Sequence, residues 1–100
     1  MRVAEVIGTV TLSQALPELP PGQWLIARPL PLDALATGAA SAVEAVIAFD
    51  ELGAGLGARV GLSEGREAAM PFHPRPVPID VYCAAVLDAV VAEPAEAAGA

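Results

Sequence analysis

Five short apolar segments, separated by polar or proline-rich stretches, organise this sequence. Each segment is rich in Val, Ile, Leu or Thr, which is typical of β-strands. We therefore predict strands at Arg2–Leu12, Gln23–Arg28, Val43–Phe49, Arg59–Leu62 and Val86–Val91. Five short strands with frequent turns predict an all-β protein, built as a small closed or nearly closed barrel. Gly8 lies inside the first strand and predicts a bend or bulge there.

The segments between the strands are expected to be mostly irregular. Glu64–Met70 has helix-forming residues with acids near its start, so it predicts one short helical turn. Ile79–Tyr82 follows a proline and is expected to turn helically. Pro71–Pro78 contains four prolines and is expected to be irregular. Asp33–Ala42 is expected to be a mobile, Ala-rich connection.

One domain at residues 1–91 is the expected organisation, because 100 residues form a single domain. The remaining tail, residues 92–100, is rich in Ala and Glu and is predicted to be disordered. The beginning of the chain has an acid, Glu5, where a signal peptide would continue apolar, so a cytoplasmic location is expected.

Glycine occupies every second position in Gly53-Ala54-Gly55-Leu56-Gly57. This pattern either permits positive φ at nearby points or clears one face of the backbone for close approach. The segment also fits the loose dinucleotide pattern G-x-G-x-x-G/A, which has mechanical meaning only between a strand and a helix. A short strand follows here instead. Close packing of backbone against backbone is therefore favoured over nucleotide binding.

Composition and charge exclude several partners. Twelve acidic residues face five arginines, and the net charge of −7 argues against nucleic acids and anionic membrane surfaces. The chain is 55% hydrophobic but has only four aromatic residues. A high apolar content made of small side chains suggests that copies of the chain cover part of its apolar surface.

No catalytic, cofactor or metal site is predicted. His73 is the single histidine and lies far from any partner at metal-ligand spacing. Cys83 lies in an apolar run and is expected to be a small buried side chain. Asp80 and Asp88 are expected to cap a turn or to pair with an arginine such as Arg2, Arg59 or Arg66.

Three motifs, taken in order, resemble the EutN/CcmL family of bacterial microcompartment vertex proteins. They are Val6-Ile7-Gly8-Thr9-Val10, then Asp50-Glu51-Leu52-Gly53-Ala54-Gly55-Leu56-Gly57, and finally Pro78-Ile79-Asp80 followed by Ala85-Val86-Leu87-Asp88-Ala89-Val90. The resemblance covers roughly residues 2–91. It implies a five-stranded, OB-like β-barrel with one short helix, five copies of which form a ring.

The same resemblance implies a structural protein and no enzyme. The homopentamer would close the vertices of a polyhedral shell that is otherwise tiled by hexameric shell proteins. Two segments depart from the family pattern. Gly65-Arg66-Glu67 carries charges where small polar residues are usual, which would change a central opening on the five-fold axis. The connection at residues 33–42 is longer than expected.

These considerations give a candidate subunit interface and one alternative. Gly53, Gly55 and Gly57 are predicted to lie at or beside the interface, and Asp80 is assigned to the same set. The alternative is a monomeric or dimeric OB-like module that binds a small molecule or an oligosaccharide. Trp24 is the only strand aromatic with an arginine nearby, and it is expected to belong to the core or to an interface.

Overall fold

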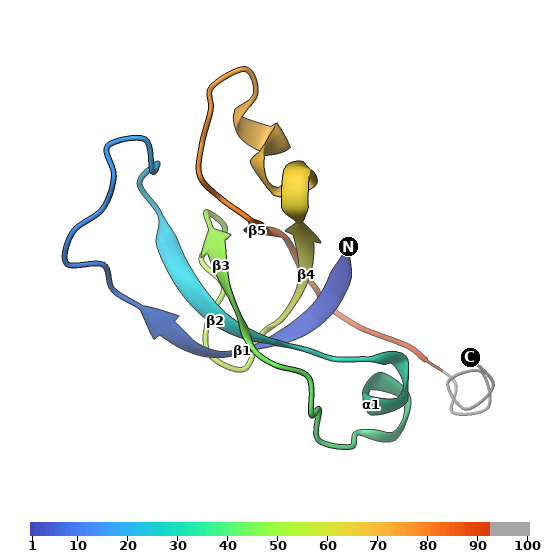
Figure 1. Ribbon diagram of the computed structural model, residues 1–100. Helices are drawn as coiled ribbons and strands as arrows, with labels where there is room; N and C mark the ends of the chain where they lie inside the picture. The colour runs from blue at the N-terminus through green and yellow to red at the C-terminus, as the bar shows by residue number, and fades with distance from the viewer. Residues whose placement is uncertain (93–100) are drawn as a thin grey trace.

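A closed five-stranded barrel is the body of the protein in the computed structural model, which describes residues 1–92. Its strands are β1 (Arg2–Val10), β2 (Gln23–Pro29), β3 (Val46–Asp50), β4 (Arg59–Glu64) and β5 (Val81–Val86). Around the barrel they follow the order β1-β2-β3-β5-β4 (Figure 1). All neighbours are antiparallel except β3 and β5, which are parallel. The predicted all-β fold and its barrel closure are confirmed.

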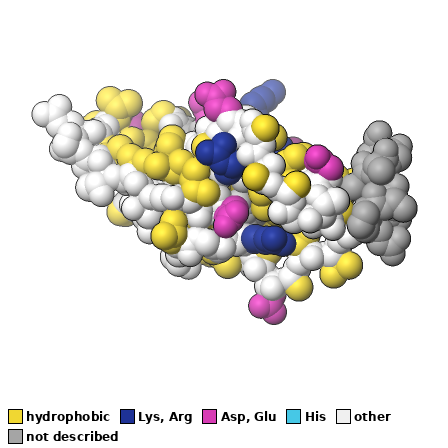
Figure 2. All heavy atoms as spheres, turned by 90° about the horizontal axis from the view of Figure 1, so that it is seen from below, with side chains coloured by type: hydrophobic (Ala, Val, Ile, Leu, Met, Phe, Trp, Pro, Cys, Tyr) yellow, Lys and Arg dark blue, Asp and Glu magenta, His cyan; other side chains and the backbone are white. Residues whose placement is uncertain are grey.

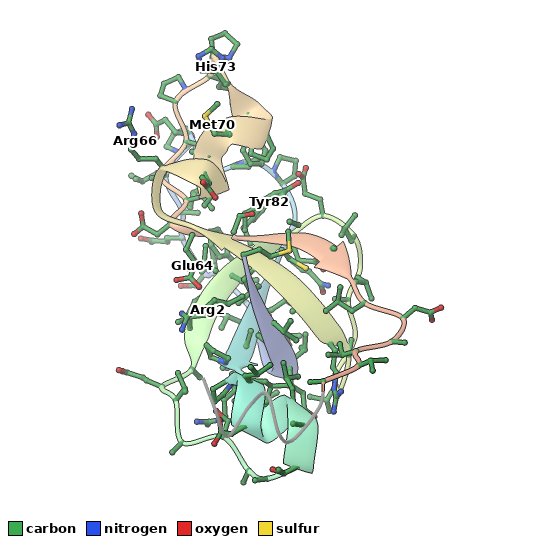
Figure 3. The ribbon with its side chains drawn as sticks, turned by 90° about the vertical axis from the view of Figure 1, so that its right-hand side faces the viewer. Arg2, Glu64, Arg66, Met70, His73 and Tyr82 are labelled. Carbon is green, nitrogen blue, oxygen red and sulfur yellow. The ribbon has the colours of Figure 1, made fainter. Side chains whose placement is uncertain are left out.

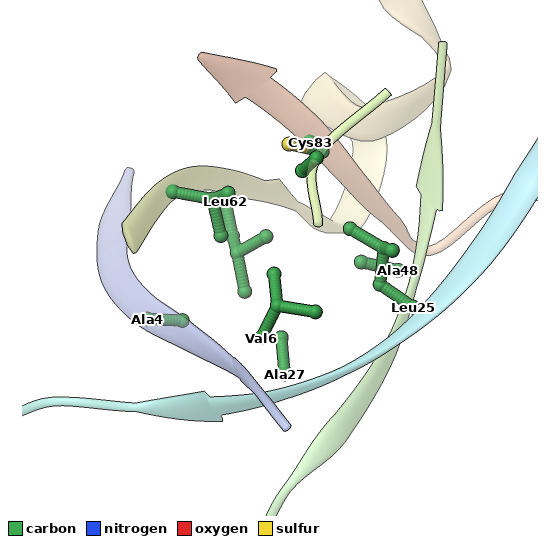
Figure 4. Close-up of a cluster of buried hydrophobic side chains, with 9 residues drawn as sticks. Ala4, Val6, Leu25, Ala27, Ala48, Leu62 and Cys83 are labelled. Carbon is green, nitrogen blue, oxygen red and sulfur yellow. The ribbon is translucent and has the colours of Figure 1, made fainter. Parts of the chain in front are cut away.

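Side chains along each strand point alternately into and out of the barrel, and those that point inward form the core. Every second side chain of β2 turns inward, and Leu25 and Ala27 are completely buried. Ala4 and Val6 of β1 do the same from the neighbouring strand, and Val60 and Leu62 close the barrel from β4. These side chains meet at the barrel centre with Ala48 and Cys83 (Figure 4). The three alanines and the cysteine among these side chains leave room for the leucines and valines in a barrel of only five strands.

The predicted irregularity at Gly8 is a β-bulge. The register of β1 against β2 shifts between Val6, which faces Ala27, and Gly8, which faces Ile26. The first half of β1 pairs with β4 on its other side, from Arg2 opposite Leu62 to Glu5 opposite Arg59. The bulge lets the second half of β1 leave β4 while it stays paired with β2.

The connection between β2 and β3 differs from its prediction. Leu32–Thr37 forms helix α1, which Gly38 ends in the left-handed conformation. After it, Ser41 accepts a hydrogen bond from the Val43 N–H, and Arg28 Nη1 donates to the Val43 carbonyl. These contacts hold the predicted start of the third strand in a loop, so β3 begins only at Val46.

The last strand was predicted at the wrong residues. β5 is Val81–Val86, so Ile79–Tyr82 does not turn helically and Val86–Val91 is not a strand. The predicted helical turn is present as the 3₁₀ helix η1 (Gly65–Phe72), which extends one residue past Pro71. Of the predicted tail, only Ala92 lies within the described residues, and it has no regular structure.

All four aromatic residues gather at the end of the barrel that carries η1. The Phe49 ring lies at their centre, 5.2 Å from Trp24, 5.9 Å from Phe72 and 6.3 Å from Tyr82 between centroids. A Cβ at Gly22 would stand 2.4 Å from Phe49 Cζ, so only glycine lets the chain pass this ring. The cluster fixes the β1–β2 loop and η1 to the barrel.

Candidate subunit interface

The segment from Asp50 to Ala58, which joins β3 to β4, contains the three candidate interface glycines. It begins at the aromatic end of the barrel and then runs beside β1. There the Gly57 N–H donates to the Val6 carbonyl at 2.8 Å, and the Val6 N–H donates to the Ala58 carbonyl at 2.9 Å. Ala54 is buried in the main core cluster. The segment is therefore an ordered part of the barrel wall.

Asp50 holds this segment in place. Its carboxylate is 1% exposed and accepts hydrogen bonds from the N–H groups of Leu52, Gly53 and Ala54 at 2.8–3.0 Å. Gln23 Nε2 donates to the same carboxylate at 2.6 Å and to the Ala54 carbonyl at 3.0 Å. A buried carboxylate is stable when its oxygens accept several N–H groups, as here.

The pKa of Asp50 reflects two opposing effects. Burial acts to raise it, because a charged group loses hydration in the protein. Hydrogen bonds from Gln23, Leu52 and Ala54 outweigh this effect, so the pKa of Asp50 lies below its ordinary value of 3.8. The ionised form is therefore the form that folding favours.

Acidification should remove the stabilisation from Asp50. Because its pKa is lower in the folded state, this contribution is complete above pH 3.8 and is lost as the pH falls through the folded-state pKa. We expect Asp50→Asn to melt well below the native protein at neutral pH, and the difference in melting temperature to narrow as the pH falls below 3.8. Circular dichroism melts across this range measure it; a gap that stays constant with pH would contradict the assignment.

The candidate glycines differ in their conformations. Gly53 and Gly57 have φ angles of 81° and 84°, which disfavour any residue with a Cβ. Gly55 is not in this region, and a Cβ on it would meet no atom within 4 Å. The monomer therefore requires glycine at positions 53 and 57 for its own backbone. At Gly55, nothing within the described chain requires glycine.

Two leucines next to these glycines face the solvent. Leu52 is 54% exposed and Leu56 is 76% exposed. Exposed apolar side chains of this size are available for contact with another molecule. The segment thus offers an ordered backbone with two apolar side chains and little bulk around them, which suits close contact with a second protein surface.

The structure separates the other candidate residues from these glycines. Gly65 follows the far end of β4 and has a φ of 65°, and its N–H donates to the Asp80 carbonyl at 2.8 Å. Gly65 and Asp80 therefore lie together, at the opposite end of β4 from Gly57. Arg66 and Glu67 are both exposed. In Figure 3 Arg66 points away from the barrel at the end where η1 lies.

The described residues contain few groups arranged for chemistry. Within residues 1–92, no three His, Cys, Asp or Glu side chains lie close enough to hold a metal ion. His73 is exposed, and Cys83 is a free and buried cysteine, as predicted. Burial, followed by the neighbouring Asp50 carboxylate, raises the pKa of Cys83 to about 12, so this thiol stays protonated.

An arginine partner was one of the two expectations for Asp80 and Asp88, beside the capping of a turn. Arg2 pairs with Glu64 instead, and Figure 3 shows these two side chains together. No ion pair of Asp80 or Asp88 is found in the part of the chain that the structure describes. The Asp50 carboxylate was not singled out in the sequence. Its signal was present, because an Asp that ends a strand shortly before a glycine is typical of a turn held by the side chain.

Comparisons with known proteins agree on one family. A family model described as "Ethanolamine utilisation protein EutN/carboxysome" matches residues 1–88. Among curated proteins, no sequence matches the chain. No helix among residues 1–92 is both long and apolar enough to cross a membrane.

Several solved structures have a fold similar to that of this chain. The pentameric shell protein MSM0273 from the RMM microcompartment is 28% identical, with a TM-score of 0.72 over 88% of this chain and 91% of that one. CcmL of Nostoc sp. PCC 7120 is 26% identical, with a TM-score of 0.76 over 90% and 92%. GrpN, a pentameric microcompartment shell protein from Rhodospirillum rubrum, is 25% identical, with a TM-score of 0.72 over 91% and 98%.

Proposed function

Because the chain belongs to the EutN/CcmL family, we propose that it is a structural protein of a bacterial microcompartment shell. Five copies form a ring that closes a vertex of the shell. The observation that carries this proposal is the family match over residues 1–88, with relatives of 28% and 25% identity described as pentameric shell proteins. The role is one of assembly and not of catalysis.

The surface of the protomer supports assembly. Eleven large apolar side chains are exposed among the described residues, Leu52 and Leu56 among them. So many exposed apolar groups on a small chain fit a protomer that buries part of its surface against copies of itself. A ring of identical copies needs two different surfaces on each protomer, joined in the same way around the circle.

The mass of the native assembly tests this function. Native mass spectrometry of the purified chain should give a species five times the 10.1 kDa mass of one chain. A single subunit at every concentration tested would overturn the proposal and would favour the alternative, an OB-like binding module.

The surrounding partners of the ring are proposed to be hexameric shell proteins. Co-expression of the chain with a hexameric shell protein should give closed particles, whereas the hexamer alone should give open sheets or tubes. Particles that close equally well without this chain would overturn its role at the vertices.

Gly55 provides the sharpest test of the glycine interface. Gly55→Val introduces a side chain that the monomer has room for, so the barrel should keep its fold. If this backbone meets the next protomer closely, the variant should run as a monomer where the native chain runs as a pentamer. Size-exclusion chromatography with light scattering measures the mass, and circular dichroism reports the fold.

Gly57→Val is the matched comparison for this experiment. Because Gly57 has a φ of 84°, this variant should lower the melting temperature of the barrel itself. A Gly55→Val pentamer with native melting would place the subunit contact elsewhere.

A further inference from the structure

Three isoleucines lie on the outside of the neighbouring strands β1, β2 and β3. Ile26 of β2 lies opposite Ile47 of β3 on one side and opposite Gly8 of β1 on the other. Ile7 precedes Gly8 in the bulge and is exposed, as is Ile47. Directly opposed residues share a face of a sheet, so Ile26 and Ile47 both point outward. We call Ile7, Ile26 and Ile47 the isoleucine face.

A second apolar surface lies across β1 from the isoleucine face. It is the segment from Asp50 to Ala58, which contains the exposed Leu52 and Leu56 and which we call the leucine segment. Val6 separates the two surfaces, since it faces Ala27 of β2 on one side and bonds with Gly57 and Ala58 on the other. The protomer therefore presents two different apolar surfaces on neighbouring parts of its wall.

We propose that the leucine segment of one protomer packs against the isoleucine face of the next, and that this contact, repeated five times, closes the ring. The inference rests on the proposed function, which makes a second copy of this chain the occupant. The two surfaces are different, so a contact between them is head-to-tail. Such a contact leaves neither surface exposed once the ring is complete.

The charges beside the two surfaces are complementary. Glu5 lies between Arg28 on β2 and Arg59 on β4, at directly opposed positions, so this row of three carries one net positive charge. The segment from Asp50 to Ala58 has one exposed charged side chain, the carboxylate of Glu51, because Asp50 is buried. Figure 2 shows a face on which apolar side chains gather beside side chains of both charges. Attraction between the Glu51 carboxylate and the net positive row beside the isoleucine face favours contact between these two surfaces.

The three glycines of the leucine segment fit the same contact. Gly53, Gly55 and Gly57 flank the two leucines, and a Cβ on any of them would point into open space in the monomer. Leu56 is 76% exposed and protrudes furthest, so it is the side chain that should insert between the isoleucines. The neighbouring backbone can then approach the sheet closely.

Charged substitutions test each surface separately. Ile47→Glu and Leu56→Glu should each convert the pentamer to a monomer, because each would bury a carboxylate with no partner. Leu16→Glu makes the same change at a leucine that is 61% exposed in the β1–β2 loop, outside both surfaces, and should leave the pentamer intact. A pentamer that persists in Ile47→Glu at the same protein concentration would overturn the inference.

Cross-linking tests the contact between the two surfaces even if a charged variant fails to fold. In a Cys83→Ala background, the double variant Ile47→Cys with Leu56→Cys should react with a short bismaleimide to give covalent species of up to five chains. Each single variant should give no ladder of this kind. A pentameric double variant that yields no cross-linked species would overturn the inference.

The results separate this inference from the function on which it depends. A native chain that is not a pentamer removes the proposed function itself. A native pentamer that resists Ile47→Glu keeps the function and removes only the assignment of the two surfaces.

Discussion

Replacing Asp50 with alanine should lower the free energy of unfolding by about 3–5 kcal/mol. The substitution removes the acceptor for Gln23 Nε2 and for the N–H groups of Leu52, Gly53 and Ala54. Hydrogen bonds to a charged group contribute roughly 1.5–3 kcal/mol each, although solvent can reach part of this loop in the variant. The loss is a large share of the roughly 5–15 kcal/mol that stabilises a typical domain.

Glu51→Ala is the matched control for this prediction. It removes the neighbouring carboxylate, which is exposed and accepts one hydrogen bond, from Tyr82 at 2.9 Å. We expect it to lower the unfolding free energy far less than Asp50→Ala does, because it removes one exposed hydrogen bond and one exposed charge instead of a buried set of hydrogen bonds. Urea unfolding at one fixed protomer concentration measures both variants, because assembly couples stability to concentration. Equal losses for the two variants would refute the anchoring role of Asp50.

Truncating Phe49 to alanine should also cost about 3–5 kcal/mol. The ring is completely buried and lies between Trp24, Phe72 and Tyr82, so its removal leaves a cavity at the centre of the aromatic cluster. It should also release η1 from the barrel, since Ala68 of η1 belongs to the same buried cluster. The expected signs are a lower urea midpoint and a loss of near-ultraviolet circular dichroism.

Leu16→Ala is the control for the truncation, because this leucine is largely exposed. It should shift the urea midpoint little. A Phe49→Ala variant that keeps both its midpoint and its near-ultraviolet signal would show that the aromatic cluster does not stabilise the barrel.

The barrel could be predicted from the sequence because its strands are short, apolar and well separated. The bulge at Gly8 and the burial of Cys83 also followed from local patterns. Helix α1 was missed, although Pro31 before it and Gly38 after it are typical boundary residues for a helix. Its Ala-rich sequence was interpreted as a mobile connection because six residues give little periodicity.

Non-local pairing explains why the position of β5 could not be predicted. Tyr82 lies opposite Phe49 of β3 and Ser63 of β4, and these contacts fix the strand at Val81–Val86. The sequence favoured Val86–Val91, where β-branched residues are denser. Local propensity cannot compete with pairing to two strands at once. One partner of Asp50 likewise comes from a strand distant in the sequence, since Gln23 lies in β2.

Trp24 is the only tryptophan of the chain, and it sits in the aromatic cluster together with the only tyrosine. Intrinsic fluorescence therefore samples one pole of the molecule. Binding or assembly near α1, at the opposite end of the barrel (Figure 1), will not change this fluorescence unless the change propagates through the barrel. Spectroscopic studies of assembly or partner docking on that side will need an introduced chromophore.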